Sequence, residues 1–123
     1  MTWGAPFASH AAPPLSGDAF QAHVVGKSFD YFKNGVFYGT ETYLTGYNVH
    51  WAFAGEECKF GYWRPRNDDI CFVYEEYLTP QCWRFQADGA AMTARFVGDD
   101  DPADYRAVPR DKPLECEGPL WGS

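Results

Sequence analysis

Turn signals recur along this chain at short intervals, and the runs between them have the composition of β-strands. Asn34-Gly35 is the sharpest signal, because both residues tolerate positive φ and suit a type I′ hairpin. The runs are rich in Val, Tyr, Phe, Trp and Thr, which fit a pleated surface. The other turn signals are Thr45-Gly46, Gly55-Glu56-Glu57, residues 64–69, residues 75–80 and Asp88-Gly89. This spacing predicts an all-β antiparallel meander.

The two ends of the chain and one internal segment depart from the strand pattern. We expect a short helix over residues 15–23, with Ser16 as its N-cap. Residues 1–22 then form a Pro-rich N-terminal tail with this helix, residues 23–119 a β-barrel and residues 120–123 a C-terminal tail. Residues 98–102 interrupt the pattern, and residues 104–108 are expected to form the last strand.

Composition excludes several classes of protein. A length of 123 residues suits one domain. A net charge of -7 with only 10 Lys and Arg argues against a nucleic-acid partner, which needs clustered positive charge. No apolar run approaches the roughly 20 residues of a membrane helix, so no membrane span is expected. The unusual quantity is the aromatic share of 19%.

Side chains alternate between the two faces of a strand, and this alternation can be followed from one strand to the next through each turn. It places most of the aromatic residues on one face. The inward face is expected to carry Phe29, Tyr31, Val36, Tyr38, Thr40, Val49, Trp51, Phe53, Gly61, Trp63, Ile70, Phe72, Tyr74, Trp83, Phe85, Met92, Ala94 and Phe96. A single continuous apolar face must close on itself to escape water. Short connections favour an up-and-down barrel of about eight strands, whose interior is either filled by side chains or keeps a cavity for one small ligand.

The opposite face is expected to be polar and outward. On this face, the turns place His50 between Glu41 on the preceding strand and Tyr62 on the following one, each opposite the imidazole. In such a row the imidazole could act as a general base. Glu41, His50 and Tyr62 are therefore weak catalytic candidates. The favoured interpretation is a solvated face with stabilising cross-strand polar pairs. His10, His23 and His50 lie in separate regions, so neither a metal nor another cofactor is expected.

The four cysteines form an even set, which favours two disulfides and an oxidising compartment. A four-residue loop over residues 75–78 would set Cys71 opposite Cys82, leaving Cys58 for Cys116. This pairing depends on both turns and stays open at this point. Reduced structural thiols and a metal site are the alternatives, the second disfavoured because no Cys-x-x-Cys spacing occurs.

Several motifs resemble those of small secreted bacterial proteins with a lipocalin-like (calycin-type) fold, most of them of unknown function. The motifs are Gly26-Lys27-Ser28-Phe29, Cys58-Lys59-Phe60-Gly61-Tyr62-Trp63, Asp69-Ile70-Cys71-Phe72-Val73-Tyr74, Pro80-Gln81-Cys82-Trp83 and Cys116-Glu117-Gly118-Pro119. The resemblance implies a barrel fold and export to a secreted or periplasmic location, and no catalytic residue. Residues 1–16 lack the pattern of a signal peptide, so we expect the natural precursor to carry one that this chain lacks.

Three functions are compatible with such a barrel. The first is binding of a small hydrophobic or aromatic molecule by the inward residues Tyr31, Tyr38, Trp51, Trp63, Tyr74 and Trp83. The second is an enzyme acting on a small aromatic substrate, by analogy of architecture with phenolic acid decarboxylases, which use Tyr, Arg and Glu in the cavity. The expected outward positions of Arg84 and Glu75 count against it. The third is an interaction module that forms a homodimer through Phe32, Phe37 and Phe60 on the outer face.

Overall fold

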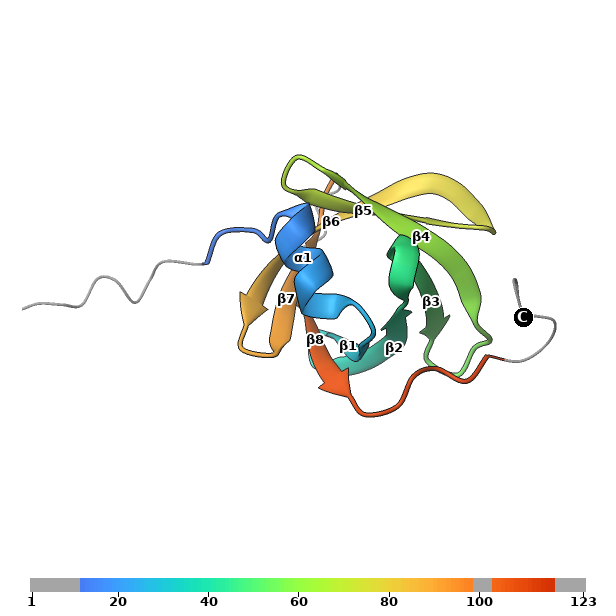
Figure 1. Ribbon diagram of the computed structural model, residues 1–123. Helices are drawn as coiled ribbons and strands as arrows, with labels where there is room; N and C mark the ends of the chain where they lie inside the picture. The colour runs from blue at the N-terminus through green and yellow to red at the C-terminus, as the bar shows by residue number, and fades with distance from the viewer. Residues whose placement is uncertain (1–11, 99–102, 117–123) are drawn as a thin grey trace, which may run out of the picture.

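The computed structural model describes residues 12–98 and 103–116, which form one closed barrel with one short helix. Each strand pairs antiparallel with the next, and the eighth pairs with the first, so the topology is up-and-down, as the turn spacing predicts (Figure 1). The elements are α1 (Gly17–Val24), β1 (Ser28–Lys33), β2 (Val36–Tyr43), the 3-10 turn η2 (Thr45–Tyr47), β3 (Asn48–Phe53), β4 (Lys59–Arg66), β5 (Asp69–Tyr74), β6 (Tyr77–Asp88), β7 (Ala91–Phe96) and β8 (Tyr105–Arg110).

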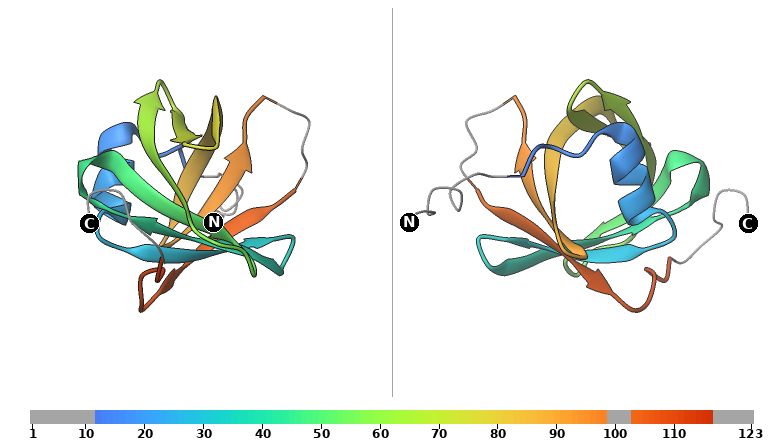
Figure 2. Two further views of the ribbon diagram at one scale, coloured as in Figure 1. Left: turned by 90° about the vertical axis from the view of Figure 1, so that its right-hand side faces the viewer. Right: turned by 60° about the vertical axis from the view of Figure 1, so that its left-hand side comes forward.

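Helix α1 lies across one end of the barrel (Figures 1 and 2). Ser16 is its N-cap, as expected, and its hydroxyl accepts a hydrogen bond from the amide of Ala19 at 3.2 Å. Phe20 is fully buried, with its ring 5.0 Å from that of Trp63 and 4.6 Å from that of Phe85. The helix is thus part of the barrel core, and Phe20 closes this end against water.

The strand directions give the barrel two different ends. β1 starts next to α1 and runs to the Asn34-Gly35 turn, where both residues have positive φ (49° and 84°), as a type I′ hairpin requires. Because the strands alternate in direction, the β1–β2, β3–β4 and β5–β6 connections all lie at the end opposite α1. We call this end the mouth of the barrel.

A β-bulge in the first hairpin changes which residues of β2 face inward. Tyr31 pairs with Gly39 but Phe32 pairs with Phe37, so Tyr38 is an extra residue on β2. The sequence-based assignment for residues 36–41 is therefore wrong beyond the bulge, because a shift of one residue exchanges the two faces. Thr40 faces outward and Glu41 faces inward.

The exposed fraction of Val36, expected inward, is 69% at the mouth. Thr40 pairs with Asp30, and its hydroxyl donates a hydrogen bond to the Asp30 carboxylate at 2.7 Å on the outer wall. Val36 and Thr40, both predicted to face the interior, are therefore corrected to the mouth and the outer wall.

Both disulfides join the cysteines that the turn analysis pairs. Cys71 and Cys82 are cross-strand partners in β5 and β6. The loop between β5 and β6 is shorter than expected, because Tyr74 already pairs with Tyr77. A register shift between Phe72 and Tyr74 compensates for the shorter loop, so Cys71 still lies opposite Cys82. The second disulfide joins Cys58 to Cys116.

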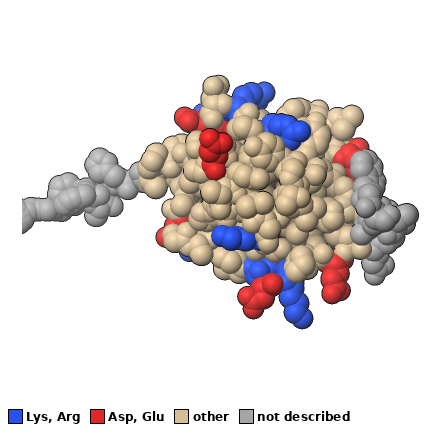
Figure 3. Space-filling view, viewed as in Figure 1, with Lys and Arg blue, Asp and Glu red and all other residues tan. Residues whose placement is uncertain are grey.

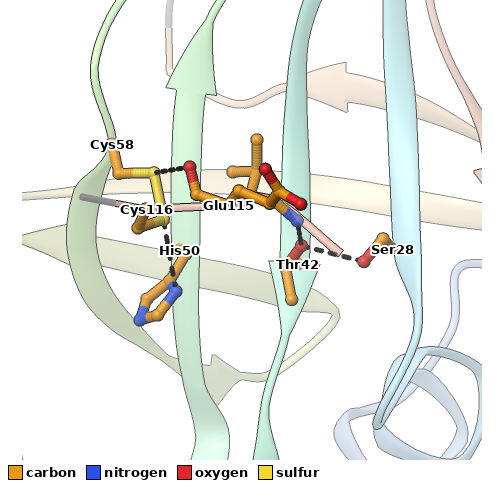
Figure 4. Close-up of a disulfide and its surroundings, with 7 residues drawn as sticks. Ser28, Thr42, His50, Cys58, Glu115 and Cys116 are labelled. Carbon is orange, nitrogen blue, oxygen red and sulfur yellow. Dashed lines mark hydrogen bonds between the residues drawn. A yellow bond between two sulfur atoms is a disulfide. The ribbon is translucent and has the colours of Figure 1, made fainter. Parts of the chain in front are cut away.

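The Cys58–Cys116 bond holds the C-terminal segment on the outer wall of the barrel (Figure 4). The amide of Leu114 donates a hydrogen bond to the Thr42 hydroxyl at 2.9 Å, and that hydroxyl also lies 2.8 Å from the hydroxyl of Ser28. The segment explains why Ser28 and Thr42, two polar residues of the outer wall, are buried.

Charged side chains are scattered over the face that carries α1, without a continuous patch of one sign (Figure 3). In the part of the chain that the structure describes, no helix is long and apolar enough to span a membrane. Of the outer aromatic residues, Phe37 is 44% exposed and Phe32 and Phe60 are half-buried, and the homodimer stays a prediction. His10, the start of the N-terminal tail, the tail at 120–123 and the final Gly118-Pro119 motif lie outside the described residues.

Candidate functional site

The barrel interior holds a cavity of about 240 Å³ between the α1 end and the mouth. Five of the six predicted ligand-binding residues line it: Tyr31, Tyr38, Trp51, Tyr74 and Trp83. The sixth, Trp63, faces inward but lies outside the cavity, against Phe20 and Tyr47 at the α1 end. The remaining lining residues are Glu41, Phe53, Lys59, Phe72, Glu76, Tyr77, Gln81, Phe85 and Tyr105.

Two inward glycines make room for the rings that line the cavity. A Cβ on Gly39 would lie 2.6 Å from the Trp51 ring and 2.5 Å from the backbone oxygen of Ala52. A Cβ on Gly61 would lie 2.7 Å from the Tyr74 ring. A side chain at either position would clash with the facing ring and with a backbone oxygen of the neighbouring strand, that of Ala52 or Val73. The close approach of both rings and both strands therefore requires glycine.

Glu41 is the acidic residue in the interior of the cavity. Only 4% of its surface is exposed, and its carboxyl group accepts a hydrogen bond from the Tyr74 hydroxyl at 2.8 Å. Burial raises the pKa of Glu41 well above its usual range, and the hydrogen bond from Tyr74 only partly opposes this shift. Glu41 therefore retains its proton at pH values at which an exposed glutamate is ionised.

The tyrosines beside Glu41 are also held in their neutral form. The hydroxyls of Tyr31 and Tyr43 lie 2.7 Å apart. Burial is the main cause that raises the pKa of Tyr31, Tyr43 and Tyr74, and the neighbouring Glu41 raises all three further. The interior thus combines aromatic surface with a small set of protonated oxygen groups.

The structure does not bring Glu41, His50 and Tyr62 together. Glu41 pairs with Trp51 on the inner face, whereas His50 faces outward. The Nδ1 atom of His50 lies 3.6 Å from the Sγ atom of Cys116, and partial burial lowers the pKa of this imidazole (Figure 4). Tyr62 is 41% exposed on the outer wall. The predicted catalytic row is therefore wrong: the wall of the barrel separates Glu41 from His50 and Tyr62, and on the outer face Tyr62 pairs with Asn48 and not with His50.

At the mouth, lysines lie beside the cavity. The Lys59 ammonium forms an ion pair with the Glu76 carboxylate at 2.9 Å. The Lys33 ammonium lies over the rings of Tyr38 and Tyr105, at 5.8 Å and 5.6 Å from their centroids. Both lysines are thus engaged at the rim rather than at Glu41.

Exposed apolar side chains surround the same opening. Val36 and Phe37 belong to the β1–β2 hairpin, and Tyr77 and Leu78 belong to the β5–β6 hairpin. Their exposed fractions run from 44% to 71%. An apolar solute that approaches the mouth therefore meets apolar surface before it reaches the cavity.

Sequence reasoning missed Glu41 as a cavity residue and did not nominate Tyr105. In β2 the neighbouring residues Phe37 and Tyr38 are both aromatic, although adjacent side chains of a strand point to opposite faces. The alternation of apolar residues therefore does not show which face of β2 is inward. For Tyr105 a signal existed, since the expected last strand alternates Tyr105 and Ala107, both of which are buried.

The chemistry available to this site is that of binding and proton donation. Among the described residues, no three His, Cys, Asp or Glu side chains converge in a way that could hold a metal ion. The four cysteines are all in disulfides, so none serves as a nucleophile. Comparison of the chain with protein-family models, with curated proteins and with solved structures finds no match.

Proposed function

We propose that this protein is a secreted or periplasmic lipocalin-like barrel that binds a small hydrophobic or aromatic molecule in its cavity. The observation that carries the proposal is the aromatic lining of an interior space of about 240 Å³. An apolar cavity of roughly 150 Å³ is enough to take benzene. A molecule with one or two rings therefore matches the available space.

The disulfides support the location. Cys58–Cys116 and Cys71–Cys82 are both formed, and such bonds persist in oxidising compartments. The resemblance of the Cys-Trp motifs to small secreted bacterial proteins points the same way.

Calorimetric titration with toluene, indole, naphthalene and octanol tests the binding function. Gln81→Trp places a large ring among the residues that line the cavity, while Gln86→Trp makes the same change on the outer wall of β6. The expected result is saturable binding of at least one compound by the wild type and Gln86→Trp, and affinity lower by about tenfold or more in Gln81→Trp. Absence of saturable binding by the wild type, or equal affinity in Gln81→Trp, would refute the proposal.

One observation favours the second candidate function, an enzyme acting on a small aromatic substrate. Glu41 is a protonated acid inside the cavity, where it could donate a proton to a bound molecule. The analogy with phenolic acid decarboxylases is incomplete, since no arginine occurs among the described residues that line the cavity. Incubation with 4-hydroxycinnamic acid, followed by ultraviolet absorbance, tests it: turnover by the wild type that is lost in Glu41→Gln supports the enzyme, and no turnover refutes it for this substrate.

A further inference from the structure

We propose that the cavity is selective for organic ammonium ions, that is, for a small aromatic or aliphatic molecule whose amino group is bound by Glu41. This inference rests on the proposed binding function and adds the chemical class of the ligand. Three features of the described residues support it: an acid without a positive partner, aromatic walls and the charges around the mouth.

Glu41 is a buried acid for which the structure describes no cationic partner. Four ion pairs join described residues, and none of them includes Glu41. Lys59, the one lysine that lines the cavity, is paired with Glu76 at the mouth. A buried carboxylate is stable only when it is paired and hydrogen-bonded. The Tyr74 hydroxyl supplies one hydrogen bond. A ligand ammonium would supply the positive charge and the further donors that the ionised form of Glu41 needs.

Aromatic walls suit the same ligand. A cation over the face of an aromatic ring is attracted by the electron density of that face. This molecule already uses the interaction at the rim, where the Lys33 ammonium lies over the rings of Tyr38 and Tyr105, both cavity residues. The aromatic groups can therefore hold the body of a ligand and also attract its charged end.

Charge around the mouth favours a cation over an anion. Three acidic side chains at the entrance, those of Glu56, Glu57 and Glu76, outnumber the two lysines there, Lys33 and Lys59. The whole chain has a net charge of -7. Such a field attracts cations and slows the approach of anions. An anionic ligand would in addition find no arginine among the described lining residues to pair with it.

Binding of an ammonium ion also implies a defined proton balance. Glu41 starts in its protonated form, so formation of the ion pair releases one proton from its carboxyl group to solvent, while the ligand keeps its own. The titratable groups that face Glu41 are Tyr31 on β1, Tyr43 on β2 and Tyr74 on β5, and all three stay protonated because their pKa values are raised. Lys59 and Glu76 are already charged at the mouth.

Three probes of similar size and different charge test the proposal: 2-phenylethylamine, 2-phenylethanol and 3-phenylpropionate. Each is titrated by calorimetry into the wild type, Glu41→Gln and Glu115→Gln. The last variant makes the same substitution at an exposed side chain outside the cavity. Repeating the amine titration in buffers of different ionisation enthalpy measures the protons released.

The expected result is that the wild type and Glu115→Gln bind the amine at least about tenfold more tightly than the alcohol, bind the carboxylate most weakly, and release about one proton with the amine. Glu41→Gln should bind the alcohol unchanged, which shows that it is folded, and lose the preference for the amine. Binding of the alcohol without preference for the amine, or a preference that persists in Glu41→Gln, would overturn this inference and leave the binding function intact. Failure of all three probes to bind the wild type would contradict both proposals.

Discussion

Replacement of Glu41 by glutamine should make the protein more stable at neutral pH and change how its stability depends on pH. In the folded state burial raises the pKa of Glu41, whereas in the unfolded chain the carboxyl group titrates near its ordinary value of 4.5. Below that pH both states carry the proton, and Glu41 contributes no pH dependence. Above it the unfolded chain loses a proton that the folded protein retains, so rising pH favours unfolding.

The size of the pH effect on stability follows from the one proton that the folded protein binds and the unfolded chain does not. The free energy of unfolding then falls by about 1.4 kcal/mol per pH unit, and by about 3 kcal/mol over two units, until the raised pKa of the folded state is reached. Glutamine has nearly the shape of a protonated glutamate, and its side-chain oxygen can still accept the hydrogen bond from Tyr74. The variant should therefore keep the folded interaction without the proton linkage.

Urea denaturation of the wild type, Glu41→Gln and Glu115→Gln at half-unit steps between about pH 4 and about pH 8 measures this difference. The pKa of His50 is lowered in the folded state, so this group makes the free energy of unfolding rise with pH. The contribution is the same in all three proteins and cancels in the comparison. Glu41→Gln should gain stability relative to the wild type as pH rises, and Glu115→Gln should not. Parallel pH profiles for the wild type and Glu41→Gln would refute the assignment of Glu41 as a buried, protonated acid.

Three further variants test how the barrel is held together and how its cavity is shaped. Phe20→Ala should lower the free energy of unfolding by about 3–5 kcal/mol in urea titrations, since it removes a fully buried ring at the α1 end. Cys58→Ser combined with Cys116→Ser should cost about 4 kcal/mol, because that bond closes a loop with a sequence separation of 58. Gly39→Ala should displace the Trp51 ring, which would shift the tryptophan emission spectrum and weaken ligand binding.

Each of these outcomes can fail. A loss below about 1 kcal/mol for Phe20→Ala would mean that α1 does not close the barrel core. An unchanged denaturation midpoint for the double serine variant would show that the C-terminal segment is held by other contacts. An unchanged spectrum for Gly39→Ala would contradict the close approach of Trp51 to β2.

Much of the architecture was predictable because its signals are local. Positive φ at Asn34-Gly35 depends on those two residues, and alternation along a strand depends on its own side chains. Most of the cavity lining was predicted in the same way, including Tyr31, Trp51 and Trp83. Trp63 was assigned to the cavity because alternation places a side chain on a face but not at a height along the barrel axis.

The amino-acid sequence alone was therefore enough to predict an up-and-down barrel with an aromatic interior. It favoured the bonds Cys71–Cys82 and Cys58–Cys116 without excluding other pairings. The inward position of Glu41, by contrast, follows only from the folded barrel. The bulge at Tyr38 lies where β2, already paired with β1, begins to pair with β3 at Gly39, and a shift of one residue exchanges the two faces of a strand. Closure of the barrel is a property of all eight strands together, so no local pattern encodes the position of Glu41, the one acid that is deeply buried among the described residues.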